Sequence, residues 1–282
     1  MAWVLRIEHH TSYLYKEPAE HSYNEARMTP LTSDGQSVID SSLAVEPEAS
    51  VLSYVDYWGS VVHAFDLHEP HRSLDVRAVS IVVTENPPAS AELPAGTVED
   101  LRSEQLRDRF AELVGPTAYA PTGGAIADAA REIAASSEPY GVFGAVHSWL
   151  AGRLVYERGV TAVSSSALEA LAAGRGVCQD YAHAGVAILR SMGVPARYVS
   201  GYFLPEGGIE LGVPVIAETH AWVGAYLGRW EACDLTNDVP VGERHVAVAK
   251  GRDYADVAPL KGVYSGGAVE RLGVSVTLTR VA

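Results

Sequence analysis

The pattern of hydrophobic positions changes close to residue 85. Before that point apolar residues alternate with polar ones, as at Trp3, Leu5 and Ile7, and valines crowd the run SLDVRAVSIVV. A period of two is typical of strands with one buried face, and prolines and polar turns separate the runs. The first 85 residues are therefore predicted to form a small antiparallel β sandwich or barrel.

A segment rich in proline, alanine and glutamate, ENPPASAELPAGTVED from Glu85 to Asp100, follows without periodicity. This composition is typical of a boundary between domains. Beyond it, apolar residues recur every three to four positions in LRSEQLRDRFAEL, AIADAAREIAASS and YGVFGAVHSWLAGRLVY. Such spacing predicts helices.

Two further helices are predicted around Cys178. Ser166 and Glu169 fit a capping box that opens a short helix, and Gly174 is placed to end it. The residues from Gln179 to Met192 have the periodicity of a second, amphipathic helix. Cys178 then lies at the N-terminus of that helix.

After this helix the pattern returns to strands, in ARYVSGYFL, HAWVGAYL and RWEACDL. Helices followed by an antiparallel sheet indicate the α+β class. We expect an N-terminal antiparallel β domain over 1–85, a linker with a connecting helix over 86–120, and a core of helices and then sheet over 121–282 that includes a C-terminal extension.

Composition narrows the classes of function. The 282 residues are 48% hydrophobic, and 35 acidic against 21 basic residues give a formal net charge of −14. Without a basic stripe to neutralise phosphates, no nucleic-acid partner is expected.

The N-terminus carries Arg6 and Glu8 where a signal peptide would be apolar, and no run of 18 apolar residues occurs. We therefore expect a cytoplasmic protein without a membrane partner. Exposed edges of the β domain would allow a homo-oligomer.

Cys178 and Cys233 are the two cysteines, too few for a disulfide framework. At a helix N-terminus, backbone N–H groups and the helix dipole favour a thiolate and could hydrogen-bond an oxyanion on an attacked carbonyl. Free cysteine is also among the most buried residue types. Position alone leaves Cys178 either structural or nucleophilic, and a nearby base would favour the nucleophile.

His220 is the candidate base. In ETHAWVGAYLGRWEACDLTND, a three-residue loop from Tyr226 to Gly228 would pair Ala225 with Arg229 and set His220 directly opposite Asp234. Opposed Cβ atoms lie ~4.5–5.5 Å apart, near enough for the carboxylate to hold the imidazole. A two-residue loop would instead separate the two side chains.

The same register places the other residues of the hairpin. Cys233 would face the core, and Trp222 would share the face of His220, where it could contact substrate or simply pack. His183 would lie on a different side of the helix that follows Cys178, so it is a poor candidate for the base.

The histidine pairs in HH and HEPHR lack nearby cysteines and well-placed carboxylates, so neither a metal nor a cofactor is expected.

Several segments resemble the bacterial transglutaminase-like family: GVCQDYAHAGVAILRSMGVPARYVSGY, THAWVGAYL, ACDLTND and GRDYADVAPLKG. HHTSYLYKEPAEHSYNEARMTP and YWGSVVHAFDLHEPHRSL resemble its N-terminal region. The resemblance implies a β domain joined to a papain-like cysteine core, with Cys178 as nucleophile, His220 as general base and Asp234 as the acid that orients it. Leu235 departs from the family, which usually has proline at this position. Without the fixed φ of proline, the turn could hold the Asp234 carboxylate less rigidly.

The favoured function is hydrolysis of an amide or peptide bond through an acyl-thioester on Cys178, with a peptide or amide as substrate. The same chemistry could transfer the acyl group to an amine if water were excluded. A non-catalytic binding module is the third alternative, against which the intact cysteine, histidine and aspartate argue.

Two features of the substrate site stay open from sequence. The segment from Gly201 to Glu218 could line the cleft or form a surface turn. Trp149, Tyr181 and Gln179 are alternatives for a second oxyanion donor.

Overall fold

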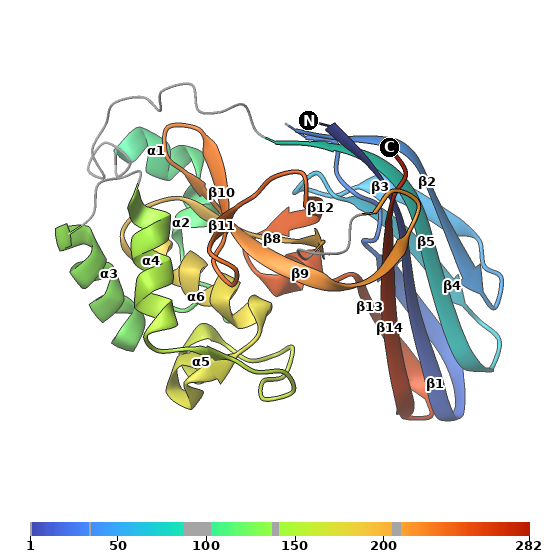
Figure 1. Ribbon diagram of the computed structural model, residues 1–282. Coiled ribbons are helices and arrows are strands. Elements are labelled where there is room, and N and C mark those ends of the chain that lie inside the picture. The colour runs from blue at the N-terminus through green and yellow to red at the C-terminus, as the bar shows by residue number, and fades with distance from the viewer. Residues whose placement is uncertain (1, 34, 87–102, 137–140, 205–209) are drawn as a thin grey trace.

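A layer of helices and a long β sheet lie on either side of a smaller group of strands in the computed structural model (Figure 1). The structure describes residues 2–33, 35–86, 103–136, 141–204 and 210–282. The predicted boundary segment therefore lies outside the described residues, except for Glu85 and Asn86. Helices are segregated from mostly antiparallel strands, which confirms the α+β class. No helix among the described residues has the length and apolar character needed to cross a bilayer.

The strands include those read from the sequence over the first 85 residues and in ARYVSGYFL, HAWVGAYL and RWEACDL. They are β1 (Ala2–Ala26), β2 (Gln36–Glu46), β3 (Val51–Val55), β4 (Val61–Leu67), β5 (His71–Glu85), β6 (Val155–Tyr156), β7 (Arg175–Gly176), β8 (Ala196–Phe203), β9 (Pro214–Tyr226), β10 (Trp230–Asp234), β11 (Val239–Pro240), β12 (His245–Gly251), β13 (Leu260–Gly266) and β14 (Val269–Arg280).

The helices lie largely in the segments where the apolar spacing predicts them, although the helix after Cys178, predicted to be amphipathic, is buried on all sides and the short helix at Tyr254 was not predicted. They are α1 (Glu104–Arg109), α2 (Ala111–Val114), α3 (Gly124–Ser136), α4 (Val142–Ala151), α5 (Ala167–Ala173), α6 (Cys178–Ser191) and α7 (Tyr254–Val257). The capping box of α5 is confirmed, since Ser166 N–H donates to the carboxylate of Glu169 at 2.7 Å and Glu169 N–H donates to Ser166 Oγ at 3.3 Å. Gly174 ends α5 with φ of 68°, which favours glycine.

The long sheet is built around β1. One edge of β1 pairs with β4 and then β5, and the other edge pairs with β13 and then β14. Residues 260–280, grouped with the core by the sequence pattern, thus pair with the N-terminal strand. β14 also pairs with the first residues of β9, through Val276 and Ala217 among others, and β9 continues into the sheet with β8. The two sheets are therefore joined through β9.

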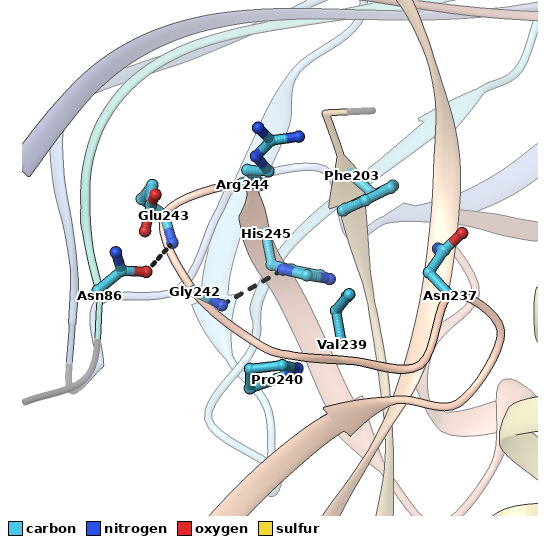
Figure 2. Close-up of a pocket in the computed structure, with 9 residues that line it drawn as sticks. All are labelled: Asn86, Phe203, Asn237, Val239, Pro240, Gly242, Glu243, Arg244 and His245. Atoms are coloured by element: carbon cyan, nitrogen blue, oxygen red, sulfur yellow. Dashed lines mark hydrogen bonds between the residues drawn. The ribbon is translucent and has the colours of Figure 1, made fainter. Parts of the chain in front are cut away.

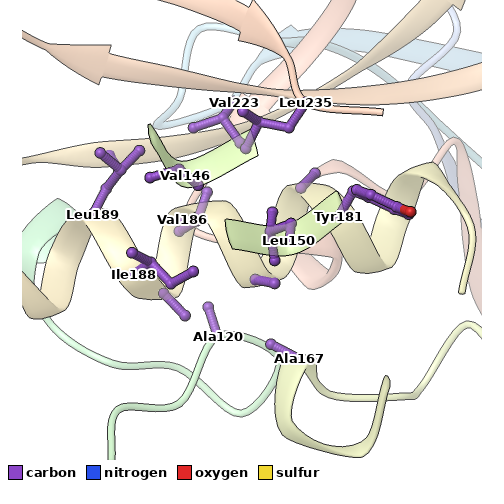
Figure 3. Packing of buried hydrophobic residues seen from close by; sticks show 14 of the residues in the cluster. Ala120, Val146, Leu150, Ala167, Tyr181, Val186, Ile188, Leu189, Val223 and Leu235 are labelled. Carbon is purple, nitrogen blue, oxygen red and sulfur yellow. The ribbon is translucent and has the colours of Figure 1, made fainter. Parts of the chain in front are cut away.

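The helix α6 is the buried centre of the helical layer. Every side chain from Asp180 to Arg190 is buried, between helices α3, α4 and α5 and the strands β8 and β9. Figure 3 shows α6 and α4 side chains in this core, with Val223 of β9 and Leu235, the residue after β10, above them. Burying each large apolar side chain stabilises the fold by about 1.5–3 kcal/mol. The first residue of α6 is consequently held on a rigid element.

Candidate active site

Cys178 is the first residue of α6, one position before the predicted helix start. The preceding Val177 is extended, and its N–H donates at 2.8 Å to Asp180, whose carboxylate also accepts from the Thr161 hydroxyl at 2.7 Å. A Cβ on Gly176 would lie 2.6 Å from Asp180 Oδ2, so a larger residue would push against this turn. These contacts fix the sulfur at the end of the helix where backbone N–H groups are unpaired.

Cys178 is partly exposed in a cleft of about 400 Å³. The walls come from the start of α6, from β8 and β9, from the segments near α5 and α7, and from β14 of the long sheet. The lining residues are Tyr156, Arg158, Val163, Val177, Cys178, Gln179, Tyr198, Ser200, Ala217, Glu218, Thr219, His220, Ala221, Tyr254, Pro259, Val274 and Val276. Both halves of the molecule therefore contribute to the cleft.

His220 lines the same cleft and is bonded to Asp234. His220 Nε2–H donates to Asp234 Oδ2 at 2.7 Å, and Asp234 is fully buried. Burial alone would lower the pKa of His220, but hydrogen bonds to Asp234 and Cys178 raise this pKa to about 9. Burial alone would raise the pKa of Asp234, yet bonds from His220 and from a second histidine, His245, hold it well below its usual range. The pair is thus an imidazolium and a carboxylate near neutral pH.

The carboxylate of Asp234 accepts more hydrogen bonds than the sequence suggested. Oδ1 accepts from the backbone N–H groups of Thr236 at 3.0 Å and Asn237 at 3.2 Å. Oδ2 accepts from Asn237 Nδ2 at 2.7 Å and His245 Nε2 at 3.3 Å. The two backbone bonds could be predicted from sequence, because aspartate side chains commonly accept from backbone N–H groups two or three residues later in a turn. The bond from His245 could not be predicted, because His245 lies on another strand, distant in sequence.

His245 separates Asp234 from a second pocket. This pocket has a volume of about 500 Å³, and its lining residues include Phe203, Asn237 and His245 (Figure 2). Gly242 N–H donates to His245 Nδ1 at 3.3 Å, which leaves the proton of a neutral ring on Nε2, facing Asp234. Burial lowers the pKa of His245 and so favours that neutral ring.

The predicted pairing of the hairpin is wrong by two residues. Tyr226 pairs with Trp230, so the loop runs from Leu227 to Arg229, and Cys233 lies opposite Val223. His220 is thus not directly opposite Asp234. The rings of Tyr226 and Trp230 pack 5.8 Å apart, which keeps Tyr226 in the strand instead of the loop. A shift of two preserves the faces, and the two side chains still meet.

Trp222 does not face the cleft. Its side chain is 1% exposed and packs edge-on against the ring of His245, at 5.2 Å between centroids. The structure favours the packing alternative for Trp222 over the expected contact with substrate. Cys233 is buried among core residues, and burial raises the pKa of its thiol to about 12.

The other sequence candidates are placed as follows. Trp149 Nε1 donates to Glu132, and the Tyr181 hydroxyl donates to the carbonyl of Leu154, so both donors are engaged away from the cleft. Gln179 lines the cleft. His183 is fully buried and accepts from the backbone N–H of Tyr254.

Tyr198 and part of the segment from Gly201 to Glu218 also line the cleft. The sequence patterns missed Tyr198, a lining residue whose pKa burial raises well above its usual value, which keeps its phenol protonated. Of the segment from Gly201 to Glu218, Ala217 and Glu218 line the cleft, and residues 205–209 lie outside the described chain.

Leu235 is held firmly after Asp234. Its side chain is 1% exposed, and a Cβ on Gly185 of α6 would lie only 2.2 Å from Leu235 Cδ1. The strand that carries Asp234 therefore approaches α6 closely at this point. Packing of Leu235, together with the bonds to the carboxylate, fixes the turn without the proline expected from the resemblance.

Comparisons with known proteins agree with this architecture. The profile of the bacterial transglutaminase-like N-terminal region matches residues 5–83, and that of the transglutaminase-like superfamily matches residues 127–235. The uncharacterised protein ML0607 of Mycobacterium leprae is 44% identical over 280 residues, covering 99% of this chain and 100% of its own. Rv2569c of Mycobacterium tuberculosis, also uncharacterised, is 34% identical over 284 residues, covering 92% of this chain and 86% of its own.

A solved structure has the same fold. The crystal structure of a candidate cysteine protease from Cytophaga hutchinsonii superposes with a TM-score of 0.75, covering 98% of this chain and 92% of that one. The sequence identity is 22%, so the similarity concerns the fold.

Proposed function

Because the chain belongs to the transglutaminase-like superfamily, and so to the papain-like class of cysteine enzymes, we propose that it hydrolyses amide or peptide bonds with Cys178 as nucleophile. His220 acts as general acid and base, and Asp234 orients its ring. The observation that carries the proposal is the 2.7 Å bond from His220 to Asp234 in the wall of the cleft that contains Cys178. A nucleophile, a base and a group that orients the base are what acyl transfer through a thioester requires.

In the proposed reaction, the Cys178 thiolate attacks the carbonyl carbon and forms a C–S bond. Backbone N–H groups at the start of α6 stabilise the oxyanion. The C–N bond then breaks, and His220 gives its proton to the departing amine from Nδ1, since Nε2 is bonded to Asp234. Water that loses a proton to His220 attacks the thioester, and the C–S bond breaks to release the carboxylic acid and restore the Cys178 thiolate beside protonated His220.

Hydrolysis is proposed over transfer to an amine because the rim of the cleft is open to water. The rim carries an ion pair between Arg158 and Glu218 at 2.8 Å, and the two side chains are 68% and 58% exposed. Transfer to an amine would need the thioester to be shielded from water.

The products of an amide donor test this proposal. Wild-type protein and Cys178→Ala should be incubated with a set of peptides, with and without a primary amine, and the products weighed by mass spectrometry. We expect wild type alone to convert the donor to the free acid, with an excess of acid even in the presence of the amine. A product that carries the amine as the dominant species would establish the transferase instead, and unchanged peptides would contradict catalysis.

Activity and stability should both change as His220 loses its proton at high pH. The pKa of His220 in the folded protein, about 9, lies above the ordinary value of 6.5. Its stabilising effect is thus fully present below about pH 6.5 and lost as the pH rises through about 9. Since the proton is also needed by the leaving amine, kcat/KM should fall over the upper part of this range.

The measurements are kcat/KM from pH 6 to 10 and the melting temperature of wild type and His220→Gln over the same range. The difference in melting temperature should shrink toward high pH. A constant difference would show that His220 is not protonated in the folded protein at neutral pH.

A further inference from the structure

Over about half of its length, one edge of β14 has no strand partner among the residues that the structure describes. β14 pairs with β1 along one edge from Val269 to Arg280, with a register shift at Glu270, whereas β9 covers the other edge only from Val276 to Thr279. Among the described residues, no strand pairs with the second edge from Val269 to Ser275. This segment is called the free edge below.

The direction of the backbone groups along β14 follows from hydrogen bonds at its end. The carbonyl of Arg280 accepts from Gly212 on the β9 side, and the N–H of Val281 donates to Val4 on the β1 side. Successive residues of a strand alternate in the edge to which they direct N–H and C=O groups. Leu272 and Val274 therefore direct theirs toward the free edge, and Gly273 and Ser275 direct theirs toward β1.

The free edge begins inside the catalytic cleft. β9 leaves β14 after Ala217, which pairs with Val276, and His220 follows three residues later on the diverging strand. Val274 and Val276 line the cleft together with Cys178 and His220. The space beside Val274, which a straight continuation of β9 would fill, therefore opens into the cleft that contains the proposed nucleophile.

The residues of the free edge next to the cleft lack the devices that normally prevent pairing. The run from Leu272 to Ser275 contains no charge and no proline, and Leu272 and Val274 are each 54% exposed. Natural edge strands are usually protected by charges, prolines or bulges, because unpaired N–H and C=O groups recruit other chains. The apolar side chains of both residues lie on the sheet face that continues from buried Val276.

We propose that the free edge of β14 binds the polypeptide substrate, which adds to the sheet as an extended strand at Leu272 and Val274 and so enters the cleft beside Cys178. Backbone hydrogen bonds would supply affinity without regard to sequence, and the exposed apolar pair would favour apolar side chains at alternate substrate positions. An occupant that continues into the catalytic cleft is a substrate chain, which is why we choose it over a second copy of this protein. The inference rests on the proposed function and names its substrate class, extended polypeptides instead of small amides.

A proline at residue 274 tests this binding mode. Val274→Pro removes one donor from the free edge, and the bonds to β1 are kept, since proline is tolerated where the strand N–H faces solvent. Val274→Ala is the matched control, because it shortens the side chain and keeps the N–H. With oxidised insulin B chain as probe, Val274→Pro should lower kcat/KM by ~3- to 10-fold, mainly through KM, as expected for one lost hydrogen bond. Val274→Ala should have a smaller effect.

A short substrate separates binding at the edge from damage to the site. The ratio of kcat/KM for insulin B chain to kcat/KM for a tetrapeptide amide spanning the cleaved bond should be lower in Val274→Pro than in wild type, and iodoacetamide should alkylate Cys178 in both proteins at the same rate. Equal loss with both substrates, or no loss with the long one, would overturn the inference and leave the proposed function standing.

Hydrogen exchange tests the edge without any turnover. In Cys178→Ala mixed with insulin B chain, the amides of Leu272 and Val274 should exchange more slowly, whereas those of Gly273 and Ser275, already bonded to β1, should not change. Unchanged exchange at Leu272 and Val274 would overturn the inference even if wild type were inactive. If Val274→Pro instead dissolved a dimer in sedimentation and left peptide kinetics unchanged, the occupant would be a second copy and the inference would be wrong.

Discussion

Replacing Cys178 by alanine should reduce amide hydrolysis by at least ~10⁴-fold, because the other thiol, that of Cys233, is buried and does not line the cleft. The fold should be little affected. Cys178 is partly exposed at the wall of a cleft, so the substitution removes few core contacts. Turnover of the best peptide substrate and the melting temperature of the same preparation are the two measurements.

Cys233→Ala is the control for this substitution. Cys233 is buried in the core, 8% exposed, with Val223 as its cross-strand neighbour. Removing its sulfur should cost about 1–3 kcal/mol of stability and leave activity measurable at low temperature. The opposite pattern, with Cys178→Ala unstable but active, would mean that the nucleophile has been assigned to the wrong cysteine.

Local signals were enough to predict much of the structure. The spacing of apolar residues located many of the helices and strands before residue 235, and Ser166, Glu169 and Gly174 located the ends of α5 because capping depends on residues only a few positions apart. The same kind of signal put Cys178 at the start of α6. His220 and Asp234 could be paired because they share the face of one hairpin, and a shift of two residues does not change that face.

Contacts between distant segments were not predictable in this way. β13 and β14 pair with β1 and so join the two ends of the chain. No residue pattern in these strands indicates which strand each one pairs with. His245 reaches Asp234 from a third strand for the same reason. The pairing of Tyr226 with Trp230 was missed because it depends on ring packing, including contacts with Phe110 of a distant segment.

Asp234→Asn should lower kcat by about 10³–10⁴-fold, although the side chain keeps its size. The amide of asparagine can turn its oxygen toward His220 Nε2, where it is a weaker acceptor than a carboxylate. It can also turn its N–H group toward Nε2. An N–H donor favours the tautomer of His220 with the proton on Nδ1, and Nδ1 then cannot accept a proton. Against the effect of burial, the carboxylate and Cys178 together raise the pKa of His220 to about 9. Without this negative charge the imidazolium is less stable, so the upper limb of the pH profile should move below 9, toward the ordinary histidine value.

Asn237→Ala is the matched control, since it removes one donor to Asp234 and leaves the charge in place. Its loss in kcat should be at most about tenfold, and its upper limb should stay near pH 9, as expected when one hydrogen bond is lost and the ion pair remains. The comparison therefore separates the charge of Asp234 from its position. If Asp234→Asn kept the upper limb of wild type, another group would be responsible for the high pKa of His220, and Asp234 would act on catalysis only by holding the ring in place.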